Sequence, residues 1–243
     1  LLAESRPNAM SELGIYGAAY KIAIVMVMFT QAFRFAYEPF IFAKNKESGD
    51  ENKKSYSDAM KYFVIFGLFI FLGVMFYLDL VRFLMPKEYF TGIEVVPIVM
   101  LAELFFGIFF NLSLWYKLTD QTQWGAWFSL FGFVVTAAIN IMFVPRFGYM
   151  ACAWAAFFCY FSMMMVSYFI GQKKYPIKYD LSSMGRYAVL TLVLYSVAVL
   201  VDIDNLFLKL LFRTALLSVF VVYMVKRDLP IEEIPLINKL IKK

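Results

Sequence analysis

The sequence predicts an all-α membrane protein, a polytopic bundle of about seven transmembrane helices. Of its 243 residues, 62% are hydrophobic and 20% are aromatic, whereas a soluble domain is usually nearer to half apolar. The apolar residues also fall in runs of about 20, the length that crosses a hydrocarbon core of about 30 Å. Short polar or turn-forming stretches separate the runs, and none is long enough to form a soluble domain.

The breaks between the spans have clear chemical signals. "KNKESGDENKKSYSDA" is strongly polar, "VPRFG" combines Pro145 with Gly148, and "GQKKYPIKYD" is basic and contains Pro176. Proline and glycine in these contexts end helices. We therefore expect a transmembrane bundle over residues 14–225, with spans at about 15–43, 60–84, 94–116, 124–144, 148–171, 185–202 and 205–225.

The lysines and arginines outside the spans and near their ends predict the orientation. One side of the membrane receives only Arg6, Arg82, Lys87, Arg146, Lys209 and Arg213, and the remaining lysines and arginines, apart from Lys21 and Arg34 within the first span, fall on the other side. The positive-inside rule makes the Lys-rich side cytoplasmic. Residues 1–13 are then an extracytoplasmic loop, and the amphipathic, basic tail 226–243 is expected to lie on the anionic inner leaflet. The start "LLAESRPNAM" shows no signal peptide and no initiator Met, so we expect a piece of a longer chain.

Several classes of function are disfavoured by the residues. Histidine is absent, which removes the commonest metal ligand and neutral-pH proton shuttle. Cys152 and Cys159 lie seven positions apart in one apolar run, too far apart to form a disulfide. No phosphate-binding glycine loop, zinc spacing or nucleophile–base pair occurs. We expect no enzyme activity, no cofactor, no metal site and no nucleic-acid partner.

The first span carries polar residues inside its apolar run. On a helix, Tyr20, Gln31, Arg34 and Glu38 fall on one face, and Lys21 lies beside it. Arg34 and Glu38 are four residues apart and can pair. A charge at the bilayer centre costs about 2.5–3.5 kcal/mol, so such residues usually face a bundle interior or a wet cavity. These residues are candidates for lining a cavity that binds an anionic substrate, and the alternative is an Arg–Glu pair that only stabilises helix packing.

A second set of polar residues lies in the third span. Glu103 and Asn111 share one side of that helix. A membrane carboxylate is a candidate for proton or sodium coupling. The alternative is a hydrogen-bonded structural glutamate.

Two blocks of the chain resemble a known family. "ELGIYGAAYKIAIVMVMFTQAFRFAYEPFIFA" is similar to the helix after the central loop of bacterial oligosaccharide-lipid flippases, which belong to the multidrug/oligosaccharidyl-lipid/polysaccharide exporter superfamily. "NIMFVPRFGYMACAWAAFFCYFSMMMVSYFIGQKKYPIKYD" resembles that family's pattern of Asn140, Pro145, Gly148, small residues and a basic loop with tyrosine. With the spans between and after these blocks, the resemblance covers nearly the whole chain.

The resemblance implies a two-lobed transporter with a cationic cavity between its lobes. This chain would be the C-terminal lobe without its first helix, followed by two further helices, and the missing N-terminal lobe would be its partner. The implied substrate is an undecaprenyl-pyrophosphate-linked oligosaccharide, flipped across the bacterial inner membrane for surface polysaccharide such as lipopolysaccharide. Arg34 would meet the pyrophosphate, Glu38 would hold Arg34 when the cavity is empty, and Gln31 and Tyr20 would bind sugar or phosphate. This chain alone is not expected to transport.

Three other interpretations stay open at this point. The first is a sister exporter of the same superfamily, either a drug or cation antiporter or the peptidoglycan-precursor flippase. The second is an integral-membrane enzyme of surface-polysaccharide assembly, although no large loop or histidine favours it. The third is a non-catalytic membrane scaffold, which Arg34 and Glu38 argue against.

Overall fold

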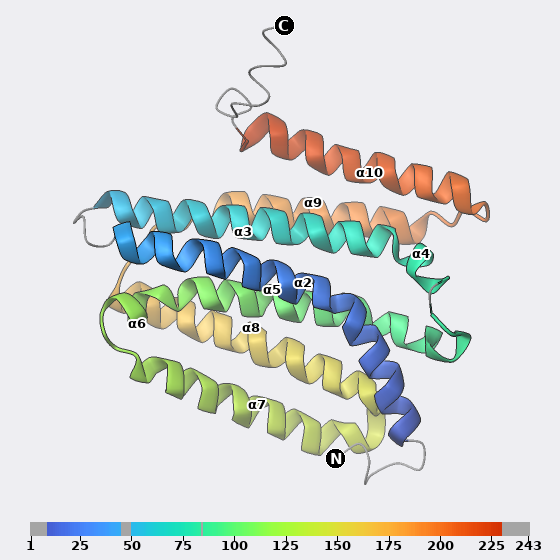
Figure 1. Ribbon diagram of the computed structural model, residues 1–243, viewed down its shortest axis with the longest axis horizontal. Helices are drawn as coiled ribbons and strands as arrows, with labels where there is room; N and C mark the ends of the chain where they lie inside the picture. Colours follow the sequence, from blue (N-terminus) through green and yellow to red (C-terminus); the bar gives the residue numbers. More distant parts are fainter. Residues whose placement is uncertain (1–8, 45–49, 84, 230–243) are drawn as a thin grey trace, which may run out of the picture.

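The computed structural model describes residues 9–44, 50–83 and 85–229, and these ranges contain helices and no strand (Figure 1). Seven helical segments are long and apolar enough to cross a membrane, which confirms the predicted fold class. The elements are α2 (Ala9–Lys44), α3 (Asp50–Phe76), α4 (Leu78–Arg82), the 3-10 helix η1 (Lys87–Val95), α5 (Val96–Leu112), α6 (Leu114–Leu118), α7 (Gln123–Phe147), α8 (Tyr149–Lys174), α9 (Leu181–Leu200) and α10 (Leu206–Arg227).

The helix boundaries differ from the predicted spans in several places. The loop predicted over 1–13 is wrong for residues 9–13, because α2 already begins at Ala9. The predicted span 60–84 is too late at both ends, since α3 runs from Asp50 to Phe76 and the short α4 follows. Hydropathy marks the apolar part of a helix, and the polar first turns of α3 extend beyond it. In the predicted tail 226–243, α10 continues to Arg227, and residues 230–243 lie outside the described ranges.

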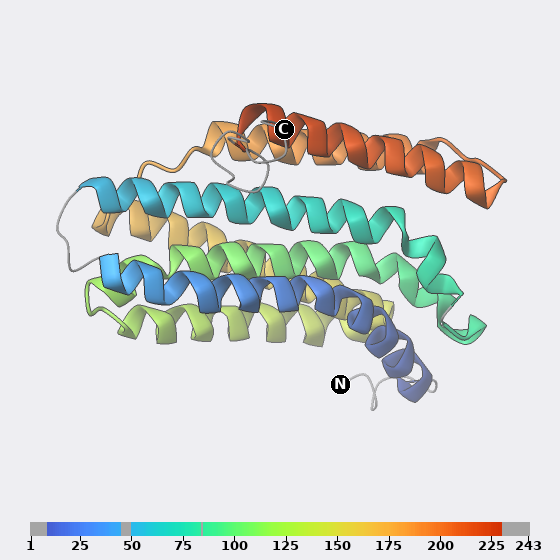
Figure 2. The same ribbon diagram turned by 45° about the horizontal axis from the view of Figure 1, so that its top comes forward.

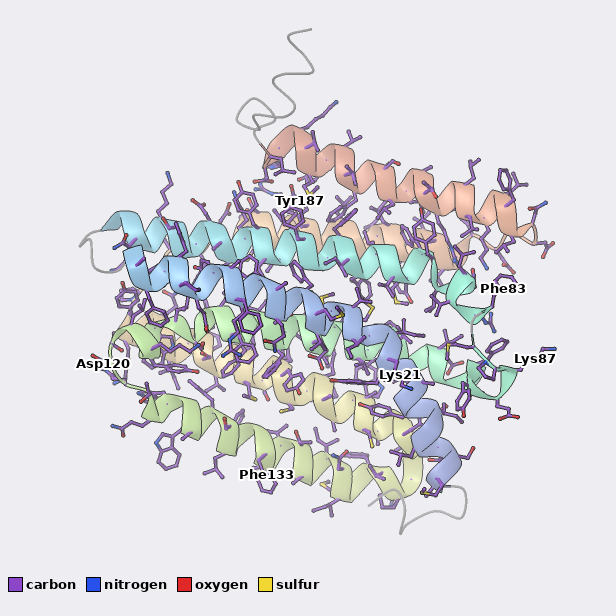
Figure 3. The ribbon with its side chains drawn as sticks, in the orientation of Figure 1. Lys21, Phe83, Lys87, Asp120, Phe133 and Tyr187 are labelled. Atoms are coloured by element: carbon purple, nitrogen blue, oxygen red, sulfur yellow. The ribbon has the colours of Figure 1, made fainter. Side chains whose placement is uncertain are left out.

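The helices pack around α5, which contacts α2, α3 and α8. On one side, α7 packs on α8, and on the other, α9 and α10 pack on α3 (Figures 1 and 2). One end of the bundle carries the end of α2, the start of α3, the α6–α7 and α8–α9 connections and the last turn of α10, and is called the basic end below. Figure 3 shows Asp120 at this end and Phe83 and Lys87 at the opposite end.

Close helix packing at the centre depends on a small residue. A Cβ added to Gly107 of α5 would lie against Phe63 of α3, and 2.9 Å from the Thr30 hydroxyl oxygen of α2. Small residues let helix backbones approach each other in membranes, where apolar burial gives no driving force between helices. On the periphery, Phe133 of α7 points away from the bundle and is 68% exposed (Figure 3), as a lipid-facing residue should be.

The turn between α7 and α8 confirms a break within "VPRFG", at Gly148, whereas Pro145 does not end the helix, because α7 continues to Phe147. Gly148 has φ 59° and ψ −139°, a conformation that is open to glycine and very costly for other residues. Its N–H donates to the Val144 carbonyl and closes α7. The chain therefore reverses over one residue, which sets α7 and α8 side by side.

Helix α10 is held to the rest of the bundle by polar groups at both of its ends. At the end opposite the basic end, the Asp79 carboxylate of α4 accepts a hydrogen bond from Arg213 at 2.7 Å and pairs with Lys209 at 3.2 Å. Arg213 also donates to the Phe76 carbonyl at 3.0 Å. These three charged residues are called the Asp79 cluster. Asp79 of α4 is therefore a paired residue that joins α4 to α10.

At the basic end, a second cluster forms around Asp228, just after α10. Its carboxylate accepts from Lys61 of α3 at 3.2 Å and from the Tyr187 hydroxyl of α9 at 2.6 Å. The Tyr62 hydroxyl donates to the Asp228 carbonyl at 3.0 Å. Tyr187 is fully buried and reaches from α9 toward α10 (Figure 3). We call these four residues the Asp228 cluster.

The N-terminus of α9 gives a direct stability prediction. The Asp180 carboxylate accepts from the Ser183 N–H at 3.0 Å and caps the helix. The hydrogen bonds from Ser183 hold the pKa of Asp180 below its ordinary value. Replacing Asp180 with Ala should lower the free energy of unfolding by about 1 kcal/mol.

Asp180→Asn is the matched control for this prediction, because asparagine also caps helices well. Since the pKa of Asp180 is lowered by folding, the wild-type contribution is present at neutral pH and is lost as pH falls through the pKa of the folded state. The asparagine variant should keep its stability without that pH dependence. Denaturant unfolding of the three proteins at neutral and acidic pH measures both effects. Equal stability of the Ala variant at neutral pH would contradict the cap.

Candidate functional site

Three charged side chains meet near the basic end of the bundle, between α2 and α6. Arg34 Nε and Glu38 Oε1 are 3.2 Å apart, and Lys117 Nζ lies 2.5 Å from the same oxygen. The side chains are 36%, 25% and 25% exposed, respectively. These residues are called the Arg34 cluster. One anion is shared by two cations, so the cluster carries a net positive charge, and its three side chains remain partly exposed.

Local structure explains how these groups come together. Arg34 and Glu38 lie one turn apart on α2, so their spacing alone brings them into contact. Lys117 arrives from α6, which starts after Ser113, where the helical path of α5 is interrupted. The Ser113 hydroxyl donates to the Phe110 carbonyl at 2.6 Å and satisfies a backbone acceptor at this break.

The surroundings of the cluster are partly aromatic and partly polar. The Arg34 guanidinium lies 4.7 Å from the centre of the Phe110 ring, a geometry that favours a cation–π contact. A depression of about 10 Å³ beside it is lined by Thr30, Tyr37 and Asn111, among others. That volume holds about one water molecule. The depression is therefore too small to hold a polyatomic anion such as phosphate.

A second polar contact lies on the other half of α2. The Tyr20 hydroxyl donates to Glu103 Oε1 of α5 at 3.2 Å, and Glu103 is only 6% exposed. Tyr20 and Arg34 are fourteen positions apart, which is about 21 Å along a helix. Tyr20 therefore belongs with Glu103 and does not belong to the Arg34 cluster.

The remaining predicted site residues lie in neither contact. Gln31 is half-buried. Lys21 is exposed and lies near the bend in the first half of α2 (Figure 3). Asn111 donates to the Gly107 carbonyl of its own helix at 3.1 Å and lines the depression beside Arg34. Glu103 and Asn111 therefore do not form one coupling site. They face two different polar residues of α2.

Sequence reasoning missed Lys117 as a site residue. In the sequence it directly follows the apolar span 94–116 and therefore resembles the other lysines of the Lys-rich side. The pairing of Lys117 with Glu38 joins residues 79 positions apart, so no local spacing could reveal it. A lysine directly after an aromatic pair, Trp115 and Tyr116, is also an ordinary membrane-interface pattern.

The chemistry available at the Arg34 cluster is the binding of an anion. It offers a planar guanidinium, an ammonium and a carboxylate that competes for both. Among the described residues, no group of three Cys, Asp or Glu side chains could hold a metal ion. Comparison with known proteins returned no matching family model, no curated relative and no similar solved structure.

Proposed function

We propose that this chain is the C-terminal part of a flippase that moves an undecaprenyl-pyrophosphate-linked oligosaccharide across the bacterial inner membrane for surface polysaccharide. In this proposal, the C-terminus of the chain lies on the cytoplasmic side of the membrane, as the distribution of lysine and arginine predicts. The seven apolar helices are consistent with a multi-pass carrier. The observation that carries the proposal is the Arg34 cluster, two cations that share one carboxylate on an accessible face.

The cluster suits a pyrophosphate group for electrostatic reasons. A doubly charged phosphate group cannot enter a low-dielectric region without cations, and guanidinium binds phosphate oxygens bidentately. Lys117 adds a second, flexible donor next to Arg34. Glu38 neutralises part of this charge in the absence of substrate. The free energy of holding the two cations in the membrane region is therefore lower than it would be without the carboxylate. A phosphate group then exchanges with Glu38 as the partner of the two cations.

The Tyr20–Glu103 contact supports a role in ion coupling and is also compatible with the alternative function, a sister exporter. A nearly buried carboxylate inside a membrane helix is a functional candidate by default. In a flippase it would take up and release a proton or cation as the lobes rock. In a cation-coupled drug antiporter, the same carboxylate would also bind the proton or cation, and the transported substrate would be a drug. Substrate identity, tested below, separates these two proposals.

Complementation of a strain that lacks its own oligosaccharide-lipid flippase tests the proposed function. The complete reading frame that contains this chain is expressed, and surface polysaccharide is measured. The wild type should restore export, and Arg34→Ala should reduce it to near background, because the guanidinium provides bidentate phosphate contact. Arg82→Ala is the matched control, since Arg82 also stacks on a phenylalanine, Phe90, at 4.9 Å, but lies at the opposite end.

Two outcomes would contradict the proposal. If the wild-type frame inserts correctly and yields no polysaccharide, the substrate assignment is wrong and the sister exporter gains support. If export is restored and Arg34→Ala behaves like Arg82→Ala, the cluster serves helix packing only. Immunoblots of membrane fractions show whether each variant is inserted to the same level.

A further inference from the structure

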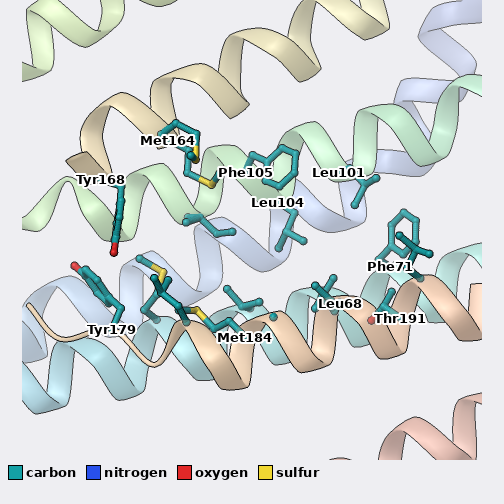
Figure 4. Close-up of a pocket in the computed structure, with 18 of the residues that line it drawn as sticks. Leu68, Phe71, Leu101, Leu104, Phe105, Met164, Tyr168, Tyr179, Met184 and Thr191 are labelled. Carbon is teal, nitrogen blue, oxygen red and sulfur yellow. The ribbon is translucent and has the colours of Figure 1, made fainter. Parts of the chain in front are cut away.

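A large apolar cavity separates two layers of the bundle. It has a volume of about 630 Å³ and lies between α3 and α9 on one side and α5 and α8 on the other. Figure 4 shows Leu104, Phe105 and Met164 on one wall and Leu68 and Met184 on the other. An apolar space of this size does not hold water well, because each water needs two to four polar partners. Left empty, it would forfeit dispersion contacts along both walls.

The depth and volume of the cavity suit the hydrocarbon part of a lipid. Along α3 its wall extends from Met60 to Phe71, which is about 16 Å at 1.5 Å per residue. This is close to half of a 30 Å hydrocarbon core, or roughly the depth of one leaflet. A methylene group takes up roughly the same volume as a water molecule in the liquid, roughly 30 Å³. The volume of the cavity therefore corresponds to roughly 20 methylenes.

The cavity is open to the membrane along α9. Leu181 and Leu192 both line it, and they are 53% and 66% exposed. Helix α9 packs against α3 and α10 and makes no comparable contact with α8. A chain in the surrounding bilayer can therefore enter sideways, between α8 and α9, without passing through the protein.

The end of the cavity nearest the basic end has interfacial chemistry. Figure 4 shows Tyr168 and Tyr179 there, with their hydroxyl groups turned toward each other, while Phe71 and Thr191 lie at the far end. Tyrosine is enriched where lipid headgroups meet the hydrocarbon. The two tyrosine rings therefore indicate the depth in the membrane at which the headgroup of a bound lipid would join its acyl chain.

Positive charge flanks this end of the cavity. Lys178 and Arg186 adjoin the lining residues Tyr179 and Gly185 in sequence, and both are exposed. Neither forms an ion pair within the described part of the chain, although Arg186 donates to the Ser183 hydroxyl at 2.7 Å. The nearby carboxylate of Asp180 is engaged in capping α9. Exposed cations near an anionic leaflet are attracted to its lipid headgroups.

We propose that this cavity binds one acyl chain of an anionic glycerophospholipid from the leaflet at the basic end. The chain fills the space between the two helix layers, and the headgroup lies near Lys178 and Arg186. The site is separate from the Arg34 cluster, and the proposal does not depend on the transport function. A polyisoprenoid chain is the less suitable occupant, because it is bulkier and several times longer than the cavity.

Photo-crosslinking in vesicles tests this proposal. The 243-residue chain is placed in phosphatidylcholine vesicles that contain phosphatidylglycerol with a diazirine on one acyl chain. Mass spectrometry locates the adducts after irradiation. We expect labelling of the lining residues Met164 and Met184 to exceed several-fold that of the lipid-facing Phe133. An unlabelled phosphatidylglycerol competitor should suppress cavity labelling more than phosphatidylcholine does.

A cavity-filling variant provides the decisive comparison. A Cβ added to Gly185, which lines the cavity, meets nothing within 4 Å, and the same holds for Gly17 of α2, which does not line it. Gly185→Phe should therefore reduce cavity labelling several-fold without a clash at its Cβ, whereas Gly17→Phe should leave it unchanged. Replacing Lys178 and Arg186 together with Gln should remove the preference for phosphatidylglycerol.

Three results would overturn the proposal. Labelling of Met164 and Met184 no stronger than that of Phe133 would show that no chain occupies the cavity. Equal competition by phosphatidylcholine would remove the anionic lipid as the occupant. Suppression by polyprenyl phosphate at lower concentration than by phosphatidylglycerol would assign the cavity to an isoprenoid chain.

Discussion

Replacing Asp79 with alanine should release one end of α10 from the bundle and lower the free energy of unfolding by about 3 kcal/mol. Asp79 is the shared partner of Arg213 and Lys209, at 2.7 and 3.2 Å. Its removal leaves two cations together without a counter-ion, and Arg213 is only 12% exposed. Breaking a buried ion pair from one side costs about 3–5 kcal/mol, and partial exposure of Asp79 places the expected value at the lower end.

The effect should be confined to one end because α10 is held twice. The Asp228 cluster joins the other end of α10 to α3 and α9 through Lys61 and Tyr187. Between the clusters, few α10 residues are buried, with Phe220 and Met224 as the exceptions. Apolar packing gives little preference for protein over lipid in a membrane. The polar clusters therefore determine where α10 docks.

Spin-label distances measure this local release. Labels at Leu80 and Phe207, which are 43% and 72% exposed, report the end near Asp79 in a background with both cysteines replaced by alanine. The distance distribution should broaden in Asp79→Ala, and thermal unfolding should occur at lower temperature. Asp204→Ala is the control, because Asp204 is an exposed acid near the start of α10 that forms no ion pair within the described residues. An unchanged distance distribution in Asp79→Ala would show that apolar packing alone holds α10.

The sequence was sufficient for the number and order of the spans because hydropathy and turn signals are local properties. Pro145 and Gly148 marked the α7–α8 reversal, and the structure has it at that position. Helix ends were less predictable. The polar first turns of α3 and residues 9–13 of α2 are helical outside the apolar runs, so a rule based on lipid depth cannot place them.

The same distinction between local and distant contacts applies to the polar residues. The Arg34–Glu38 pair was predictable from its spacing of one helical turn, and it is present. The pairs Lys117–Glu38, Tyr20–Glu103 and Arg213–Asp79 join positions 79, 83 and 134 residues apart. Their formation depends on which helices pack together, and hydropathy does not contain that information. For this reason Tyr20 was grouped with Arg34, and Lys117 was missed.

If the Arg34 cluster binds pyrophosphate, its charged residues should affect affinity with opposite signs. Glu38→Gln should tighten binding of undecaprenyl pyrophosphate by about tenfold, and Lys117→Gln should weaken it by about tenfold. Glu38 repels the phosphate and competes for both cations, whereas Lys117 attracts it. Unit charges about 4 Å apart near a protein surface interact by about 4 kcal/mol. Solvent screening of side chains that are a quarter or more exposed reduces this to about 1.4 kcal/mol, a factor of ten.

Titration of the chain in nanodiscs measures these affinities directly and separates recognition of phosphate from that of the prenyl tail. Undecaprenol, which lacks the pyrophosphate, should bind wild type and variants equally. Glu88→Gln is the matched control for Glu38→Gln, because Glu88 is an exposed carboxylate of η1 at the opposite end, so its removal changes net charge by the same amount and should leave affinity unchanged. If Glu38→Gln instead weakens pyrophosphate binding, the carboxylate is needed to position Arg34 and Lys117, and competition is not its role. Equal affinities in all variants would place the phosphate site elsewhere and leave the Arg34 cluster with a packing role alone.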